Sequence, residues 1–276
     1  MSIVVADSGA TKIDWVWTDG HQKFYAETKG INPASQPNFA EQPLGIDEGF
    51  KSVEAVYFYG AGITNSTMVD SMSNYLRRNG FVGSIFMYSD VLGAARAIFQ
   101  KDIGVICILG TGSVCAGYDG ERIKTLKPSL GYIIGDEGSG SDLGKEVLRQ
   151  YFYNEMPEVI QENFRSIYNL TKDQLIHSLY KDQGGAAFLA SFANFLTEWK
   201  DHEWTENILT VLFDSFINRK LKEQIEHHND KVGFVGSIAF IHKKILVKSL
   251  EKAGINNVEF LQRPLDNLLR YHLTYN

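Results

Sequence analysis

The sequence predicts an α/β fold in which two mixed β-sheets are covered by helices. A strand, a glycine turn and a second strand occupy residues 4–15, and residues 105–116 repeat this pattern. The dipeptide Asp19-Gly20, which follows the first strand pair, returns as Asp119-Gly120 after the second. Helices and strands alternate after each of these segments. We therefore expect two copies of one supersecondary unit, with a ligand cleft between the two sheets.

The first half should begin with an antiparallel meander, because three apolar segments are separated by glycine turns. Residues 30–45 hold several prolines and glycines, which predicts a loop. Buried strands and amphipathic helices then alternate. The expected elements are strands 3–7, 13–18 and 23–28, a short helix within 45–53, a strand at 55–59, a helix at 65–79, a strand at 84–88 and a helix at 90–100.

The second half repeats the meander and then becomes rich in helix. A glycine-rich stretch at 131–140 predicts a loop, and the segment 143–226 has almost continuous helical periodicity. Its aromatic residues between 188 and 199 recur at helical spacing and are expected in the core. The other expected elements are strands 105–109, 114–118 and 122–126, a strand at 231–235, a helix at 239–253, a strand at 258–261 and a terminal helix from Pro264.

Length and composition favour two domains in a compact protein. The chain has 276 residues, of which 44% are hydrophobic and 22% are charged, and it contains six prolines. We expect an N-terminal domain at 1–102 and a C-terminal domain at 103–276. The second domain would carry the helical insertion, and the terminal helix would pack back on the first domain.

The charge balance disfavours nucleic acid or a membrane as the main partner. The formal net charge is -6, and the chain has no long run of Lys or Arg. No segment is apolar enough to span a bilayer, and the N-terminus enters a strand without a signal-like core. We expect a cytoplasmic protein. Cys107 and Cys115 fall in predicted strands and are expected to be buried thiols, not metal ligands or a disulfide.

The two glycine turns predict a phosphate-binding clamp for a nucleotide. Small residues let backbone N–H groups approach an anion closely, and nearby hydroxyl and ammonium groups add donors. The candidate residues are Gly9, Ala10, Thr11 and Lys12 in the first turn and Gly110, Thr111, Gly112 and Ser113 in the second.

Two aspartates, Asp7 and Asp90, are candidates for a metal-binding or catalytic role. For each of them a purely structural role is the alternative. Asp7 closes the first strand and could bind Mg²⁺ together with phosphate oxygens. Stabilisation of its own turn is equally compatible with the residues. Asp90 could accept a hydroxyl proton in phosphoryl transfer. It also begins a helix, and from the residues alone the N-cap role is favoured.

Two further glycine segments could bind ligands. The segment 135–142 contains Asp136 and Glu137 between glycines, which suits hydrogen bonding to sugar hydroxyls, although a loop capped by Ser141 or Asp142 would look similar. Gly236 and Ser237 lie where a strand turns into a helix, a weak signal for a base or ribose. His227 and His228, at a helix end, are expected to be solvated.

Taken in order, these segments resemble the BadF/BadG/BcrA/BcrD ATPase group of the sugar kinase, Hsp70 and actin superfamily, and within it the N-acetylglucosamine kinases. The resemblance spans nearly the whole chain. It rests on the segments Asp7-Ser8-Gly9-Ala10-Thr11-Lys12, Lys29-Gly30-Ile31-Asn32-Pro33, Tyr88-Ser89-Asp90, Leu109-Gly110-Thr111-Gly112-Ser113, residues 131–140, and Val235-Gly236-Ser237-Ile238-Ala239.

The resemblance implies two ribonuclease-H-like domains, of the actin and hexokinase type, that flank a nucleotide cleft. It also implies ATP-dependent phosphorylation of N-acetylglucosamine or N-acetylmuramic acid, with Asp90 as the base for the 6-hydroxyl and Asp7 at the Mg²⁺ position. Thr11 and Thr111 would contact phosphates. The amino sugar would be held by Asn32, Gly131, Tyr132, Asp136 and Glu137.

Three residues depart from the family pattern. Val114 and Tyr132 replace an Asn and a Trp, which bears on the identity of the acceptor, and Ser237 replaces a glycine of the adenosine segment. A BadF-type ATPase or activase acting on a protein partner is an alternative, although its cluster-bridging cysteines have no counterpart here. A non-catalytic nucleotide- or sugar-binding regulator is another. The expected partner is a small amino sugar, and a homodimer is compatible with the pattern.

Overall fold

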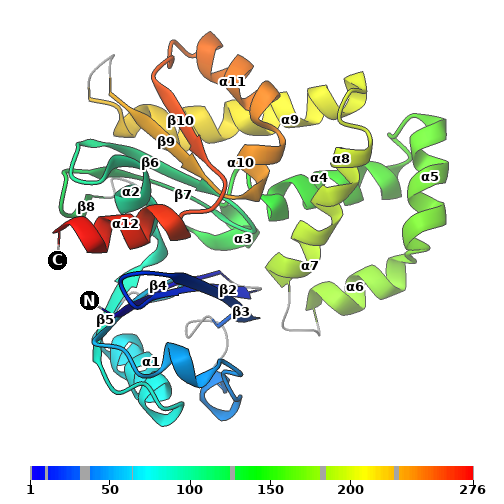
Figure 1. Cartoon of the computed structure of the whole chain (residues 1–276). Coiled ribbons are helices and arrows are strands. Elements are labelled where there is room, and N and C mark those ends of the chain that lie inside the picture. Colours follow the sequence, from blue (N-terminus) through cyan, green and yellow to red (C-terminus); the bar gives the residue numbers. More distant parts are fainter. Residues whose placement is uncertain are drawn as a thin grey trace. The chain divides into compact units, whose positions relative to one another are not determined.

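The computed structural model describes residues 2–9, 12–31, 38–63, 65–124, 128–180, 185–226 and 230–275. The chain forms two compact units (Figure 1). The first unit contains Met1–Asp102, Tyr118–Ile123 and Arg263–Asn276. The second contains Ile103–Gly117 and Lys124–Gln262.

The first unit is built on a five-stranded mixed sheet with strand order β3-β2-β1-β4-β5. The first three strands pair antiparallel, and β1, β4 and β5 run parallel. The elements are β1 (Ile3–Ser8), β2 (Lys12–Thr18), β3 (Lys23–Lys29), η1 (Phe39–Glu41), η2 (Glu48–Phe50), β4 (Ala55–Gly60), α1 (Ser66–Arg78), β5 (Ser84–Ser89), α2 (Asp90–Phe99) and, at the end of the chain, α12 (Leu265–Tyr275).

The two faces of this sheet have different coverings, because side chains alternate along each strand. Val4, Ala6 and Trp15 point into a core that also contains Met72 and Leu76 of α1. The opposite face packs against α2 and α12, both of which contact β1. Asp7 alternates with Ala6 and therefore belongs to the face that α2 and α12 cover.

The second unit repeats the topology of the first. Its sheet has the order β10-β9-β6-β7-β8, so in both sheets the first strand lies between the second and the fourth of the set. The elements are β6 (Gly104–Leu109), β7 (Ser113–Tyr118), β8 (Ile123–Lys124), α3 (Gly131–Ile134), α4 (Gly140–Tyr153), α5 (Glu158–Tyr168), α6 (Lys172–Tyr180), α7 (Gly185–Ser191), η3 (Phe192–Asn194), α8 (Phe195–Glu198), α9 (Glu203–Phe216), η4, a π-helix (Ile217–Leu221), η5 (Lys222–Gln224), β9 (Val232–Val235), α10 (Ser237–Ile241), α11 (Lys243–Lys252) and β10 (Val258–Leu261).

The helical insertion packs on this sheet through one large apolar core. Phe164, Phe192, Phe195 and Phe213 are fully or almost fully buried in it, together with Cys107. The expected core role of the aromatic residues in 188–199 is therefore confirmed for Phe192 and Phe195. Cys107 and Cys115 are buried free thiols, with their sulfur atoms 3.3 Å apart.

Two predicted elements of the second unit are wrong in detail, and a third is only partly within the described residues. The loop at 131–140 contains a short helix, α3, closed by a hydrogen bond from the Gly135 N–H to the Gly131 carbonyl. The helix predicted at 239–253 is two helices, because His242 ends α10 and its carbonyl oxygen accepts the first hydrogen bonds of α11. The third meander strand covers only Ile123–Lys124 within the described residues.

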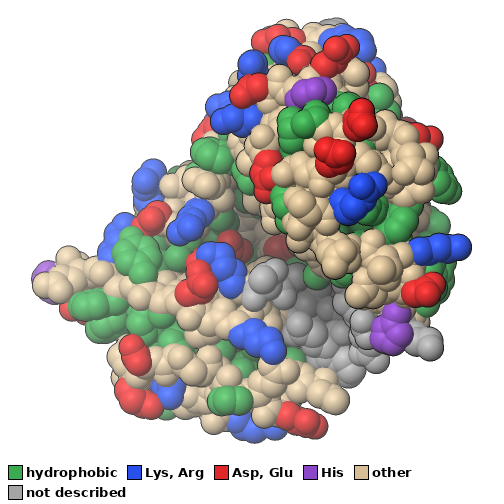
Figure 2. Space-filling view, turned by 90° about the vertical axis from the view of Figure 1, so that its right-hand side faces the viewer, with side chains coloured by type: hydrophobic (Ala, Val, Ile, Leu, Met, Phe, Trp, Pro, Cys, Tyr) green, Lys and Arg blue, Asp and Glu red, His purple; other side chains and the backbone are tan. Residues whose placement is uncertain are grey.

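Figure 2 shows Lys and Arg side chains interspersed with Asp and Glu side chains on the face that it displays. Among the described residues, no helix combines the length and apolar composition that a membrane crossing requires.

Candidate functional site

In the first unit, the carboxylates of Asp7 and Asp14 lie directly opposite each other on β1 and β2. Like charges at such paired positions repel each other. Burial, together with the charges of Asp90 and Asp14, raises the pKa of Asp7 to about 7, and the nearby Lys12 charge limits this rise. Among the described residues no hydrogen bond to the Asp7 carboxylate is found, and its role in the turn stays a prediction because Ala10 and Thr11 lie outside the described residues.

Asp90 is the first residue of α2, and the helix is capped by its neighbour. The Ser89 hydroxyl accepts the Leu92 N–H at 3.3 Å, so the expected N-cap role of Asp90 is wrong. The Asp90 Oδ1 accepts the adjacent Val91 N–H at 2.9 Å, and among the described residues no hydrogen bond to its other oxygen is found. Burial raises the pKa of Asp90, although the side chain remains partly exposed. The second carboxylate oxygen is therefore available for a ligand.

The first glycine turn is closed by its own backbone. The Gly9 N–H donates to the Lys12 carbonyl at 2.9 Å. The Lys12 ammonium lies 2.8 Å from both Asp14 Oδ1 and Glu27 Oε2, so a bound phosphate would compete with two carboxylates for it. The candidate residues Ala10, Thr11 and Asn32, and likewise His227 and His228, lie outside the described residues.

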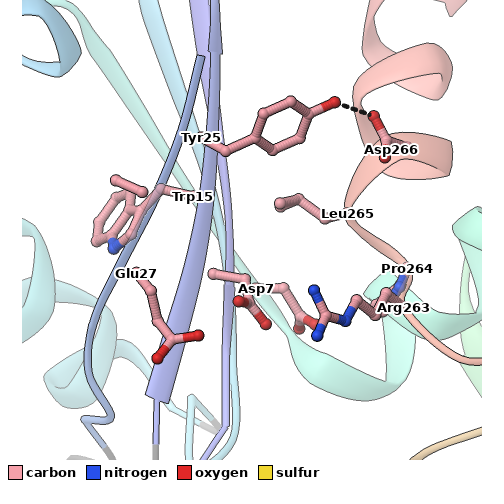
Figure 3. A pocket seen from close by; sticks show the side chains of 10 residues that line it. Asp7, Trp15, Tyr25, Glu27, Arg263, Pro264, Leu265 and Asp266 are labelled. Atoms are coloured by element: carbon pink, nitrogen blue, oxygen red, sulfur yellow. Dashed lines mark hydrogen bonds between the residues drawn. The ribbon is translucent and has the colours of Figure 1, made fainter. Parts of the chain in front are cut away.

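A cavity of about 340 Å³ opens beside Asp7 in the first unit (Figure 3). Arg263 extends towards Asp7 in this view, and the Tyr25 hydroxyl donates to Asp266 Oδ1 at 2.8 Å. The cavity combines acidic groups with one guanidinium group. Its lining residues are Asp7, Asp14, Trp15, Tyr25, Ala26, Glu27 and residues 263–266.

In the second unit, the turn between β6 and β7 is held by the start of α4. The N–H groups of Gly140 and Ser141 donate to the carbonyls of Gly110 and Thr111, at 2.8 and 3.0 Å. The Gly110 N–H donates within the turn to the Gly112 carbonyl. The N–H groups of Thr111 and Gly112 have no partner among the described residues. They are the donors of this turn that a phosphate could accept.

The segment after α3 packs directly on this turn. The buried Asp136 accepts the Ser113 N–H on Oδ1 at 3.3 Å, and it has a left-handed backbone with φ of 57°. A Cβ atom on Gly112 would lie 2.9 Å from Asp136 Oδ2, so only glycine leaves room for the carboxylate. Burial raises the pKa of Asp136. The candidate phosphate and sugar segments of this unit therefore form one connected surface.

The predicted cap of α4 is also corrected. Ser139 caps the helix, accepting the Asp142 N–H at 3.3 Å, so neither Ser141 nor Asp142 is the cap. Asp142 instead accepts the Gly138 N–H and pairs with Lys145 at 3.2 Å. These contacts order a segment that its composition alone would describe as mobile.

Two further candidates for sugar binding, Gly131 and Tyr132, lie in the short helix α3. The Tyr132 carbonyl accepts the Lys145 ammonium at 3.0 Å. A Cβ on Gly185 would lie 2.3 Å from the Tyr132 hydroxyl, so this ring packs against a glycine. Gly131 begins α3 and is exposed.

The segment 235–239, which was expected to bind adenosine, lies beside the second glycine turn. Gly236 has a φ of 111°, and a Cβ there would lie 2.3 Å from the Leu109 carbonyl oxygen. The exposed Ser237 is the first residue of α10. The structure thus brings together Gly110–Ser113, Asp136 and Gly236 in one unit, as it brings together Asp7, Lys12 and Asp90 in the other.

Sequence reasoning missed Lys220, whose ammonium is buried beneath the second turn. It lies 2.9 Å from the Ser113 hydroxyl, 3.0 Å from the Ser113 carbonyl and 3.3 Å from Glu137 Oε2. A sequence signal existed, because Lys220 occupies the buried stripe of a helix that otherwise carries Phe213, Phe216, Ile217 and Leu221. No cluster of three or more metal-ligating side chains was found in the described part of the chain.

Comparisons with known proteins agree with this architecture. No family model matches the chain. A curated N-acetylmuramic acid/N-acetylglucosamine kinase from Clostridium acetobutylicum is 24% identical over 221 residues, covering 78% of this chain and 69% of the relative. A Streptomyces griseus ROK family glucokinase, solved with glucose and AMPPNP, shares the fold with a TM-score of 0.58 at 13% identity, covering 97% of this chain and 98% of its own.

The family is shown by a solved structure from Porphyromonas gingivalis, provisionally assigned as an N-acetylglucosamine kinase. It superimposes with a TM-score of 0.89, is 33% identical and covers 99% of both chains. The expected sugar-kinase fold is confirmed by this match and by the two sheets of identical topology. The chain belongs to the N-acetylglucosamine kinase family of sugar kinases.

Proposed function

We propose that this protein transfers a phosphoryl group from ATP to a hydroxyl of an N-acetylated hexosamine, N-acetylglucosamine or N-acetylmuramic acid, with Asp90 as the general base. The observation that carries the proposal is the state of Asp90. Its helix is capped by Ser89, and one of its carboxylate oxygens has no hydrogen-bond partner among the described residues. The names of the relatives supply the reaction class.

The environment of Asp90 suits proton abstraction from an alcohol. Burial raises the pKa of its carboxyl, which makes the carboxylate a stronger base than an exposed aspartate. Because most residues of α2 are apolar and buried, the backbone that carries the Asp90 carboxylate is held in place. In phosphoryl transfer such positioning supplies most of the catalytic effect.

The described residues fit a nucleotide and a magnesium ion. Among the described residues, a Cβ on Gly110 would meet no atom within 4 Å, and one on Gly9 would meet only the Lys12 carbonyl at 3.7 Å, so these residues do not require glycine at either position. We propose that these glycines leave room for phosphate oxygens. Asp7 would hold Mg²⁺, because its carboxylate is repelled by two neighbouring acids that a cation would neutralise. When bound, the ion would supply charge neutralisation on the phosphates.

The proposal also assigns the other candidate residues to the phosphates, the nucleoside and the amino sugar. Thr11, Lys12, Thr111 and Ser113 would contact phosphates, and Gly236 and Ser237 would contact the nucleoside. Asp136 and Glu137 would bind the amino sugar with Gly131, Tyr132 and Asn32. The buried Asp136, which accepts the Ser113 N–H, makes the sugar and phosphate ligands of the second unit interdependent.

A coupled assay for ADP tests the proposal. We expect ADP release that depends on N-acetylglucosamine or N-acetylmuramic acid and on Mg²⁺, whereas glucose and N-acetyl-free glucosamine serve as comparison sugars. ADP release that is indifferent to every sugar would refute the kinase assignment and favour an ATPase. Ligand-induced thermal stabilisation without any ADP would favour a regulator. A cytoplasmic location and a homodimer remain predictions.

A further inference from the structure

The helix that ends at Gln224 presents two buried polar side chains to one strand. Residues 213, 216, 217, 220, 221 and 224 form its buried stripe, and all except Lys220 and Gln224 are apolar. Both polar residues reach β7: Lys220 contacts Ser113 at its start, and the Gln224 Oε1 accepts the Gly117 N–H at 3.1 Å. Lys220 lies within a π-helical turn, a distortion that often marks functional positions.

The three contacts of Lys220 join two segments that are distant in sequence. Two go to the hydroxyl and carbonyl of Ser113 in the glycine turn, and the third goes to Glu137. A buried ammonium with no partners is costly, so a lysine here requires these acceptors. The Ser113 N–H binds Asp136, which closes the arrangement.

The charge of Lys220 also acts on Asp136. Burial and the charge of Glu137 raise the pKa of the Asp136 carboxyl, whereas Lys220 and Lys145 lower it, as does the hydrogen bond from Ser113. Removal of the Lys220 charge would therefore favour protonation of Asp136. A protonated Asp136 would lose part of its ability to accept hydrogen bonds from sugar hydroxyls.

We propose that Lys220 is a positioning residue that holds the Ser113 turn and the Asp136–Glu137 segment in one geometry, so that nucleotide binding and amino-sugar binding depend on each other. The proposal rests on the proposed function, which places phosphates at the turn and the sugar at the segment. Lys220 itself touches neither ligand. It acts through Ser113, Glu137 and Asp136.

The test uses the full chain with the substitution Lys220→Met and a matched control, Gln224→Met. Both remove a buried polar contact between the same helix and β7, but only Lys220 reaches the turn and Glu137. We expect Lys220→Met to lower kcat/KM for both ATP and the amino sugar about 10- to 100-fold, since small misplacements of ligand groups have effects of this order. Gln224→Met should change either value less than about threefold.

A second readout separates positioning from general stability. In Lys220→Met, the acid limb of the kcat/KM profile should move to higher pH, because Asp136 loses a favourable cation. Lys220→Arg, which keeps the charge, should restore the wild-type limb. If Lys220→Met does not unfold cooperatively, Lys220→Gln provides the same comparison.

The outcomes distinguish two failures. A wild-type protein without sugar-dependent ADP release refutes the proposed function. An active wild type in which Lys220→Met keeps its kcat/KM values, in which Gln224→Met loses as much activity, or in which only one substrate is affected, refutes the role of Lys220 alone.

Discussion

The two glycine turns share a backbone plan but differ in charge. In the first unit, Asp7 lies at the end of β1, opposite Asp14, and Lys12 is paired with two carboxylates. In the aligned repeat, Ile108 takes the position of Asp7 and Ser113 that of Lys12. The cation of the second turn comes instead from Lys220, on the helical insertion.

Under the proposed function, this difference gives the two glycine turns different tasks. The strand order is the same in both sheets, so the backbone delivers a glycine turn at the same place in each. In the first unit, acidic groups of raised pKa suit a cation and a proton acceptor. In the second, backbone N–H groups suit anion binding, and the buried Lys220 holds the turn through Ser113.

The largest effect should come from substitution of Asp90, because no residue of the second unit is proposed as a general base. Asp90→Asn should lower kcat about 10³-fold, because the amide cannot accept the hydroxyl proton. Asp19→Asn, at the exposed turn of the same unit, is the matched control and should retain wild-type kcat. Steady-state kinetics measures both, and a fully active Asp90→Asn would remove the proposed base.

A second prediction compares the buried histidines of the two units. Burial lowers the pKa of His272 to about 3 and that of His242 to about 4, so both are neutral in the folded protein at neutral pH. Below a pH of about 6.5 the unfolded chain binds protons that the folded chain does not. Stability should be complete above that pH and decrease on acidification, by about 1.4 kcal/mol per pH unit for each histidine.

The substitution His272→Gln sharpens this comparison. His272 Nε2 lies 2.7 Å from the Tyr59 hydroxyl, which also accepts Arg96 at 3.0 Å, so a glutamine oxygen can replace the neutral ring nitrogen as acceptor. Urea unfolding between pH 7 and pH 4 should show a shallower loss of stability in His272→Gln, and an unchanged one in the exposed His21→Gln. An unchanged slope in His272→Gln would mean that this ring is already protonated in the folded state.

The third prediction concerns the two turns directly. Gly9→Ala and Gly110→Ala should each raise the KM for ATP about tenfold, because a methyl group would occupy space proposed for phosphate oxygens. Neither should lower Tm, since no close contact opposes the added Cβ. Gly117→Ala, on β7 with its nearest contact at 3.8 Å, is the control for KM. If the KM for ATP rises in only one of the two variants, the proposal that both turns contact phosphates is contradicted.

The smallest effect should follow Lys12→Met. Its two ion pairs involve a side chain that is 39% exposed, and such pairs contribute less than about 1 kcal/mol. Chemical unfolding should therefore detect little change in the free energy of unfolding. If Lys12 also contacts a phosphate, the KM for ATP rises while stability stays constant; a large loss of stability would contradict this description of the ion pairs.

The duplication could be predicted from sequence because the glycine turns and the Asp-Gly dipeptides are local signals. The cap of α2 could not, since Ser89 and Asp90 are adjacent and both are good N-cap residues. Lys220 was missed because its partners, Ser113 and Glu137, are distant in sequence. The helix α3 was missed because glycines at both ends resemble a loop, and the predicted ligands Ala10, Thr11 and Asn32 lie outside the described residues.

Phosphorus NMR of a reaction with ATP, Mg²⁺ and N-acetylglucosamine tests the central claim most directly, with Asp90→Asn run in parallel. We expect one sugar phosphate to form for each ADP in the wild type, and almost none in the variant. ADP accompanied by inorganic phosphate in place of a sugar phosphate, for either N-acetylglucosamine or N-acetylmuramic acid, would contradict the account.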